Sequence, residues 1–260
     1  MSTRRALLAG VVGVVAFGVL WELYVRLFDV QRFILLAPST IARELVDRPR
    51  FYADAALVTA WHAAAGIAIS LVAAVLLGGV LAASRFLEQA AQPVLIGVLV
   101  APWIAYFSSI VLWLGSGDLP VIFLVAFVTT PAFVFATVAG MRSADPAARE
   151  LLASVDANRV EVLWRLRLPA ALPTILAAAR FNLGLALAAS YYAEGGNLSN
   201  EGLGAAGRRA IGQNADALWA TIVTMVGLGA VLLAALSAIE RLALRWHVSQ
   251  RTRTRARGAP

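Results

Sequence analysis

ARELLASVDANRVEVLWRLRLPAALP, residues 148–173, is a charged segment with a helical pattern of leucines, and it interrupts an otherwise apolar chain. On both sides lie long runs of Ala, Val, Leu, Ile and Phe. The chain as a whole is 60% hydrophobic and 14% charged, whereas a soluble domain is about 25% charged. Most of this chain is therefore built for a lipid bilayer, and residues 148–173 lie outside it.

Six apolar runs are long enough to cross a bilayer, whose hydrocarbon core matches about 20 residues of α-helix. They cover residues 6–25, 56–83, 91–114, 119–141, 173–193 and 217–239. The first run is too long for a removable signal peptide and lacks a small-residue cleavage site. The sequence therefore predicts an all-α, polytopic membrane protein with six transmembrane helices. Residues 1–250 form the membrane domain, with a cytoplasmic loop at 142–172, and residues 251–260 form a basic, disordered tail.

Several kinds of chemistry are excluded by residue types that the chain lacks. All 22 basic residues are Arg, and a Walker A loop requires a Lys to reach the nucleotide phosphates. There is no Cys, which excludes disulfides and thiolate metal sites. His62 and His247 fall in different segments and are too few for a His-based metal site, so we interpret each as a packing or interface residue. We expect no catalytic residue, no metal and no cofactor.

The arginines predict the orientation of the chain in the membrane. With both termini on the cytoplasmic side, fourteen Arg lie in inner segments and seven in outer segments, while Arg180 falls inside a span. Positively charged loops favour the cytoplasm, so both termini are predicted to be cytoplasmic. The pI near 10.9 is explained by these arginines, and we expect no nucleic-acid partner.

Two further patterns fall in the outer loops. Pro38, Ser39 and Thr40 predict the start of a short amphipathic helix, because Ser and Thr cap helix starts. Residues 202–207, GLGAAG, match the dinucleotide-binding pattern literally, but that fingerprint requires a preceding strand and a βαβ unit. A membrane helix precedes it here, so we interpret the segment as a glycine-rich re-entrant turn at the outer face.

Two short amphipathic helices, with an elbow near Asp156, are predicted inside the charged segment. Asp145 followed by Pro begins the first helix, and Asn158 with Glu161 forms a capping box that begins the second, which is predicted to end at Pro169. Their apolar faces comprise Leu151, Leu152 and Val155, then Val160, Leu163 and Trp164. Helices this short are unstable alone, so the pair either lies on lipid headgroups or docks on a cytoplasmic partner.

These residues resemble the E-A-A-x-x-x-G motif of the six-span permeases of ABC importers for nitrate, sulfonates, taurine and related solutes. Glu150 matches the Glu, and Leu168-Pro169 matches the L-P ending that follows the motif. Leu151 and Leu152 stand in place of the two Ala, and Asp156 stands in place of the Gly that makes the turn. Asp tolerates turn and left-handed conformations better than most residues, so the elbow is expected to survive.

The resemblance extends over nearly the whole chain. APWIAYFSSIVLWLGSGDLPVIFLVAF (101–127) is similar to the family's P-x-x-A followed by L-W-F-G-x-G-[ED]. Residues 140–143, GMRS, resemble its G-L-R-S, and Ala193-Glu194 with residues 202–204, GLG, resemble its A-E and G-L-G. The order and spacing of these pieces identify the chain as a member of this family.

The resemblance implies the fold of a type I ABC importer permease and a division of labour among several chains at the bacterial inner membrane. Two copies of the permease form the path as a homodimer, two ATP-binding subunits dock on the loop, and a periplasmic or lipid-anchored binding protein delivers the solute. The residues implied in coupling to the ATPase are Arg149, Glu150, Leu151, Leu152, Val155, Asp156, Arg159, Val160 and Leu163.

The same residues bear on other functional classes and on the identity of the solute. A membrane enzyme lacks support, because no His/Asp cluster and no paired intramembrane carboxylates are expected, and the charged loop argues against a structural scaffold. Co-purification with an ATP-hydrolysing subunit separates a transporter from both. Sulfonate, taurine, nitrate and a pyrimidine- or flavin-type vitamin precursor all remain open as the solute.

Polar residues in or near the spans are candidates for the solute path, because ionisable groups at membrane depth are costly and usually functional or paired. Arg180 either attracts an anionic solute or extends towards the headgroups. Hydroxyls either line the path or bond helix to helix, and aromatics either contact a flat solute or belong to an interfacial belt. The candidates are Arg180, Asn182, Glu194, Ser108, Thr129 and Tyr106.

The arginine distribution yields a prediction about topology. A reporter fused after Pro260 is expected on the cytoplasmic side, and one inserted near Asn200 on the outer side, because the inner segments carry twice as many Arg. Enzymatic reporters that are active on only one side of the membrane measure this. Finding both reporters on the same side contradicts the six-span arrangement.

Overall fold

The structure, a computed structural model, describes residues 3–244 as a bundle of helices without strands. The predicted tail at 251–260 and His247 lie outside the described residues. The helices are α1 (Thr3–Leu27), α2 (Pro38–Asp47), α3 (Pro49–Ala83), α4 (Arg85–Val100), α5 (Phe107–Leu114), α6 (Asp118–Arg142), α7 (Pro146–Ser154), α8 (Arg159–Val162), α9 (Leu168–Gly195), α10 (Gly202–Ala210) and α11 (Ala215–Ala243).

Five helices are long and apolar enough to cross a membrane alone, and the sixth predicted crossing is broken. The predicted span over 91–114 is bent, because α4 and the segment Trp103–Leu114 meet at 88°. Proline disfavours the helical conformation at the residue before it. Ala101, which precedes Pro102, accordingly takes an extended conformation with ψ at 136°, and the chain turns there.

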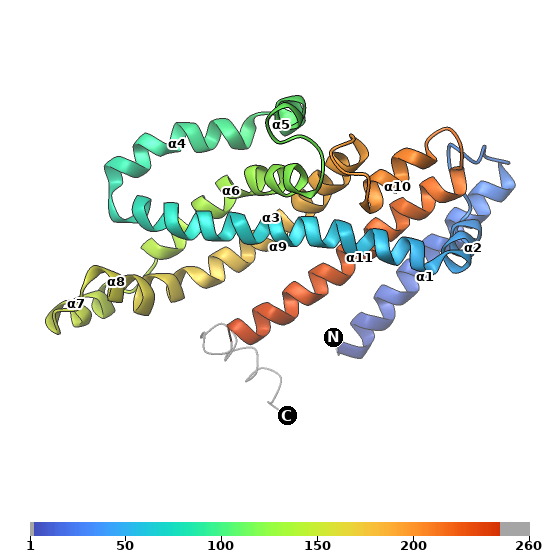
Figure 1. The fold of residues 1–260 in the computed structure, drawn as a ribbon. Coiled ribbons are helices and arrows are strands. Elements are labelled where there is room, and N and C mark those ends of the chain that lie inside the picture. The colour runs from blue at the N-terminus through green and yellow to red at the C-terminus, as the bar shows by residue number, and fades with distance from the viewer. Residues whose placement is uncertain (1–2, 245–260) are drawn as a thin grey trace.

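Helices α3, α6 and α9 pack together through the middle of the molecule (Figure 1). Small residues allow their backbones to approach closely, as in many membrane helix pairs. A β-carbon at Gly66 of α3 would lie 2.4 Å from the side chain of Val125 on α6. One at Gly140 of α6 would lie 2.6 Å from the Cα of Ala171 on α9. These three helices therefore form the close-packed centre of the chain.

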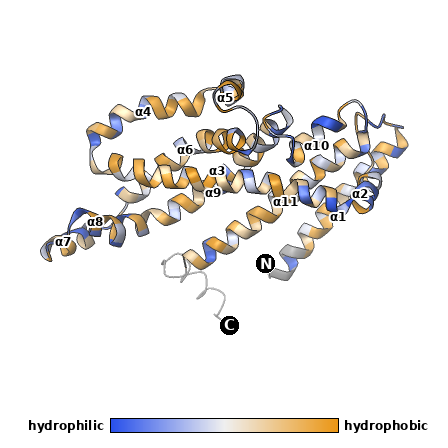
Figure 2. Ribbon diagram, in the orientation of Figure 1, coloured by the Kyte–Doolittle hydropathy of each residue, from blue (hydrophilic) through white to orange (hydrophobic). Residues whose placement is uncertain are grey.

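The remaining long helices present apolar surface outward. Hydrophobic colouring runs along α1, α4 and α11, while hydrophilic residues gather around α7, α8 and α2 (Figure 2). Only 6% of the most apolar stretch of α1 is buried. This distribution is the reverse of a soluble protein and matches helices that face lipid.

Helix α2 forms as predicted, but its cap differs from the prediction. Ala37 occupies the N-cap position and Pro38 the first turn. Ser39 instead bonds to Glu22 of α1, its N–H and its hydroxyl each donating to a carboxylate oxygen, at 2.9 and 2.7 Å. The hydroxyl thus joins two helices rather than capping one.

The second helix of the charged segment runs directly into α9, so its predicted end at Pro169 is wrong. Residues Leu163–Arg167 form one π-helical turn, in which the N–H of Leu168 donates to the carbonyl of Leu163. Pro169 then falls in the first turn of α9, where a missing N–H is tolerated. The result is a continuous helical stretch of 37 residues, Arg159–Gly195, which joins α8 to the membrane without a loop.

Close packing at Gly140 makes a testable prediction. Gly140→Val is expected to lower the free energy of unfolding by about 1–3 kcal/mol, because the added side chain meets backbone atoms of α9 that cannot move aside. Thermal unfolding of the purified protein in detergent measures it. Gly97→Val is the matched control, since a β-carbon there has no atom within 4 Å. Equal melting temperatures for the two variants would contradict the packing described.

Candidate functional site

Helices α7 and α8 project together from one end of the bundle (Figure 1), and each begins with the predicted cap. The carboxylate of Asp145 accepts the N–H of Ala147 at 3.0 Å. The side chain of Asn158 accepts the N–H groups of Val160 and Glu161 at 3.0 and 2.9 Å. In return, Glu161 accepts the N–H of Asn158 at 2.9 Å. The capping box is therefore confirmed, and it fixes where α8 begins.

The elbow between α7 and α8 is formed by Asp156. Its φ is +52°, in the left-handed region that Gly adopts freely and Asp adopts better than most residues. The next N–H, of Ala157, donates back to the carbonyl of Leu152 at 3.0 Å. Asp therefore makes the turn at the place where the resembling motif has Gly.

Four large apolar side chains on and after these two helices are exposed. The exposed fractions are 67% for Leu151, 68% for Val155, 62% for Val160 and 61% for Trp164. Leu152 and Leu163 are only partly exposed, and Leu163 packs against the core cluster that contains Phe133 and Met141. Of the two predicted apolar faces, Leu151, Val155, Val160 and Trp164 are thus exposed, whereas Leu163 is turned towards the bundle.

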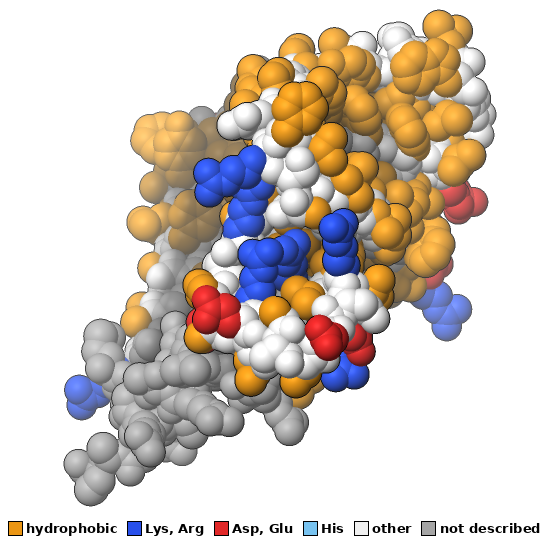
Figure 3. Space-filling view, turned by 90° about the vertical axis from the view of Figure 1, so that its left-hand side faces the viewer, with side chains coloured by type: hydrophobic (Ala, Val, Ile, Leu, Met, Phe, Trp, Pro, Cys, Tyr) orange, Lys and Arg blue, Asp and Glu red, His pale blue; other side chains and the backbone are white. Residues whose placement is uncertain are grey.

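Charged side chains surround this apolar face. Figure 3 views the molecule from this end and shows arginine and acidic side chains lying among hydrophobic ones. The exposed charged residues include Arg149, Glu150, Asp156 and Arg159. A surface with apolar residues inside a rim of charges has the composition of a protein–protein interface. We call Leu151, Val155, Val160 and Trp164 the docking face.

Two ion pairs join different long helices, and one of them lies next to α7. Arg142, the last residue of α6, pairs with Glu88 in the first turn of α4. Arg180 on α9 pairs with Glu240 near the end of α11, and its Nε donates to the carboxylate at 2.9 Å. Arg180, a candidate for the solute path, therefore already has a carboxylate partner.

A buried polar cluster lies at the opposite end of the bundle, and the sequence expectation missed it. Glu194 of α9 is fully buried. Its carboxylate accepts the hydroxyl of Thr59 at 2.9 Å and contacts Nδ1 of His62 at 2.8 Å, both on α3. The Nε2 of His62 lies 3.2 Å from Asp118 at the start of α6. The expectation that the chain has no cluster of His and carboxylates is wrong.

No local pattern signals this cluster, because His62 and Glu194 are 132 residues apart. The available signals are a single His inside an apolar run and a Glu at the end of another. An ionisable group at membrane depth needs a partner, so the two are natural candidates to meet, but only the packing of α3 on α9 decides that they do. We call Thr59, His62, Asp118 and Glu194 the His62 cluster.

Backbone N–H groups of residues 202–207 hydrogen-bond to this cluster. The N–H of Leu203 donates to the hydroxyl of Thr59, and the N–H of Gly204 donates to Glu194, each at 2.9 Å. A β-carbon at Gly204 would lie 1.9 Å from the carbonyl oxygen of Tyr191. The prediction of a re-entrant turn is wrong, since the segment is helix α10. Its N-terminus points at a buried carboxylate, which the helix dipole stabilises.

The other candidate path residues lie in separate contacts of the described chain. The hydroxyl of Thr129 contacts that of Ser70 at 2.6 Å, which joins α6 to α3. Tyr106 packs edge-on against Phe127 with ring centroids 5.3 Å apart, and Ser108 is exposed on α5. Asn182 is buried, and neither of its amide atoms has a hydrogen-bond partner within residues 3–244.

Comparison with known proteins assigns the chain to a family. Residues 62–245 match the family model described as the binding-protein-dependent transport system inner membrane component. The chain belongs to this family. The matched range begins at His62 in α3, includes the charged segment, and extends past the end of α11. The resemblance seen in the sequence is confirmed, and the protein is a membrane component of a binding-protein-dependent ABC importer.

Individual relatives agree with this assignment. The chain is 27% identical over 235 residues to the formylaminopyrimidine transport permease protein ThiX of Halalkalibacterium halodurans, covering 89% of this chain and 93% of the relative. It is 28% identical over 243 residues to the taurine transport system permease protein TauC of Escherichia coli, covering 87% and 85%.

A solved structure of the MetNI methionine ABC transporter in an inward-facing conformation shares the fold. Its TM-score is 0.61 at 20% identity, and the match covers 75% of this chain and 94% of that chain. The predicted fold of a type I importer permease is confirmed.

Within residues 3–244, no group of three His, Cys, Asp or Glu side chains is arranged to hold a metal ion.

The His62 cluster makes a prediction about stability. His62→Ala is expected to cost about 1–3 kcal/mol, because it leaves the buried Glu194 carboxyl without its hydrogen-bond partner. Thermal unfolding in detergent measures the loss. Asp118→Asn is the matched control, with an expected cost of no more than about 1 kcal/mol, since the Asp118 side chain is 60% exposed. An unchanged melting temperature for His62→Ala would show that the cluster does not hold the four helices together.

Proposed function

We propose that two copies of this chain form the membrane path of the importer, and that two separate ATP-binding subunits dock on α7 and α8 at the cytoplasmic side. A solute-binding protein then meets the opposite end, where α10 lies. The observation that carries this proposal is the docking face. Apolar side chains exposed by 60% or more on two capped helices outside the bundle are expected to bury themselves against a partner.

The local geometry supports docking over attachment to headgroups. Both helices have fixed starts, and Asp156 sets the angle between them, so the docking face is a rigid surface. Because α8 continues into α9 without a break, movement of a partner bound there reaches the membrane directly. A loop that only rested on lipid would require neither the capping box nor the continuous helix.

The composition of the chain supports the remaining parts of the proposal. The twofold excess of Arg on the side of α7 and α8 favours that side as cytoplasmic, with both termini on it. The absence of Lys excludes a Walker A loop from this chain, so ATP hydrolysis belongs to another subunit. One chain without an internal repeat supplies half of a twofold path, which favours a homodimer.

The solute that we propose is a small organic molecule, either a sulfonate such as taurine or a heteroaromatic vitamin precursor. Relatives named for formylaminopyrimidine and for taurine match this chain at 27% and 28% identity, and a permease named for riboflavin transport in Chloroflexus aurantiacus matches at 30% over 168 residues. Calorimetric titration of the cognate binding protein with taurine, formylaminopyrimidine and riboflavin separates the two classes. Nitrate as the only ligand would contradict both.

Docking of the ATPase on α7 and α8 is testable by substitution. Leu151→Asp and Trp164→Asp are each expected to weaken binding of the ATP-binding subunit by more than about tenfold, because a charge is desolvated in the contact. Co-purification from membranes and ATP-dependent uptake measure the loss. Membrane insertion is expected to be unchanged, since both positions precede the apolar run at 173–193.

Ala153→Asp is the matched control for this test. It places the same charge on α7, two residues from Leu151 and therefore on the opposite side of the helix, at a position that is also exposed. Normal binding is expected for this variant. If Leu151→Asp and Trp164→Asp also bind the ATPase and transport normally, the segment lies on headgroups and the coupling assignment is wrong.

A further inference from the structure

The ion pair between Arg142 and Glu88 connects α6 to α4 beside the docking helices. Arg142 lies three residues before Asp145, the cap of α7, and Glu88 lies in the first turn of α4. Within residues 3–244, the pairs of Arg with Asp or Glu that join two long helices are this one and Arg180–Glu240. The others join residues four apart in sequence.

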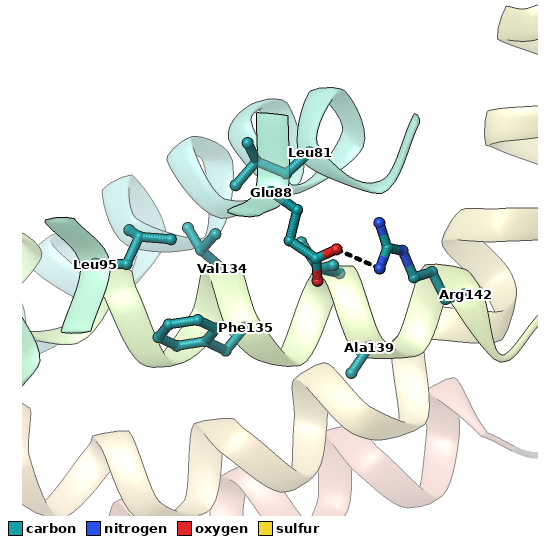
Figure 4. Close-up of a pocket in the computed structure, with 8 residues that line it drawn as sticks. Leu81, Glu88, Leu95, Val134, Phe135, Ala139 and Arg142 are labelled. Carbon is teal, nitrogen blue, oxygen red and sulfur yellow. Dashed lines mark ion pairs between the residues drawn. The ribbon is translucent and has the colours of Figure 1, made fainter. Parts of the chain in front are cut away.

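Helix α4 packs loosely against α6 behind this ion pair. None of the residues Arg85–Val100 is buried, and a cavity of about 410 Å³ lies between α4 and α6 (Figure 4). The pair spans one end of the cavity, and the remaining lining is apolar, from Leu81, Leu95, Val134, Phe135, Val138 and Ala139. Well-packed interiors contain few voids larger than a water molecule. The charges are therefore a principal link between α4 and α6 at this end.

The surroundings of the ion pair make that link resistant to separation. The side chains of Arg142 and Glu88 are 34% and 30% exposed, and apolar residues lie on the cavity side. Attraction between opposite charges strengthens as the dielectric falls, and removing one partner leaves the other poorly solvated. A displacement of Arg142 is accordingly expected to move Glu88 with it.

We propose that the ion pair between Arg142 and Glu88 transmits movement of α7 to α4. The cavity between α4 and α6 gives α4 the room to move. The inference rests on the proposed docking of the ATPase on α7 and α8. At its other end α4 leads into the bend of 88°. Movement of α4 thus changes the broken crossing, while α3, α6 and α9 stay packed.

Spin labels on introduced cysteines test this in the complete complex, because the chain has no native Cys. One labelled pair, Phe86→Cys with Leu119→Cys, reports the position of α4, and Ala147→Cys with Leu119→Cys reports that of α7. All three positions are exposed. Double electron–electron resonance measures both distances in the complex with the ATPase bound, first without and then with ATP and vanadate. The complexes are assembled with an excess of unlabelled chain, so that each carries one labelled copy.

Charge reversals form the variants of the experiment. Glu88→Arg and Arg142→Glu each place like charges together, and the double swap restores an opposite pair. Glu240→Arg is the matched control, because it makes the same change in the pair that joins α9 to α11. ATP and vanadate are expected to shift both distances in the unaltered chain, the control and the double swap. In each single reversal, the α7 shift is expected to persist and the α4 shift to be lost.

Each other outcome overturns the inference. A persisting α4 shift in both single reversals, or an absent α4 shift in the unaltered chain while α7 moves, shows that the pair does not transmit motion. Loss of the α4 shift in the control, or failure of the double swap to restore it, shows that charge pairing at Arg142 is not the cause. If α7 itself does not respond to ATP and vanadate, or the unaltered chain binds no ATPase, the proposed docking fails and the inference falls with it.

Discussion

The hydrocarbon core of a bilayer offers no hydrogen bonds, and most of the architecture follows from that constraint. Each backbone group in the spans is satisfied within its own helix, and most polar side chains are satisfied by one another. Glu194 meets His62 and Thr59, and Ser70 meets Thr129. Asn182, Thr137 and Ser190 are buried and have side-chain polar atoms without a partner in residues 3–244, and such groups are costly to bury.

Polar contacts and small residues both join the helices: Ser70 of α3 meets Thr129 of α6, and Gly66 and Gly140 allow close backbone contact. The His62 cluster, with the N–H of Gly204, joins α3, α6, α9 and α10 at the end opposite α7, and the pairs Arg142–Glu88 and Arg180–Glu240 tie α4 to α6 and α11 to α9. The centre is thus rigid, while α4 depends on few contacts. This arrangement suits the proposed transfer of motion from α7 to α4 through Arg142 and Glu88.

Local sequence was sufficient wherever one helix decides the outcome. The number and rough position of the spans, the caps at Asp145 and Asn158, and the elbow at Asp156 were all predictable, because hydrophobic length and capping chemistry act within a few residues. Predictions failed where a neighbouring element of the structure changes the conformation that a local pattern favours. Pro169 does not end a helix once a π-helical turn precedes it, and the glycines at 202–204 form a helix because a carboxylate from α9 receives its N-terminus.

The sequence by itself therefore determined that this protein is a helical membrane permease with an exposed charged segment. The order of residues along the chain is enough to show the length of the apolar runs, the distribution of arginines and the motif around Glu150. Only the tertiary structure decided which polar groups meet, since His62 and Glu194 or Glu88 and Arg142 are far apart in sequence and no period relates them. It also decided that Leu163 faces the bundle while Trp164 faces outward. Contacts of this kind depend on how α3, α4, α6 and α9 pack, and packing is a property of several helices at once.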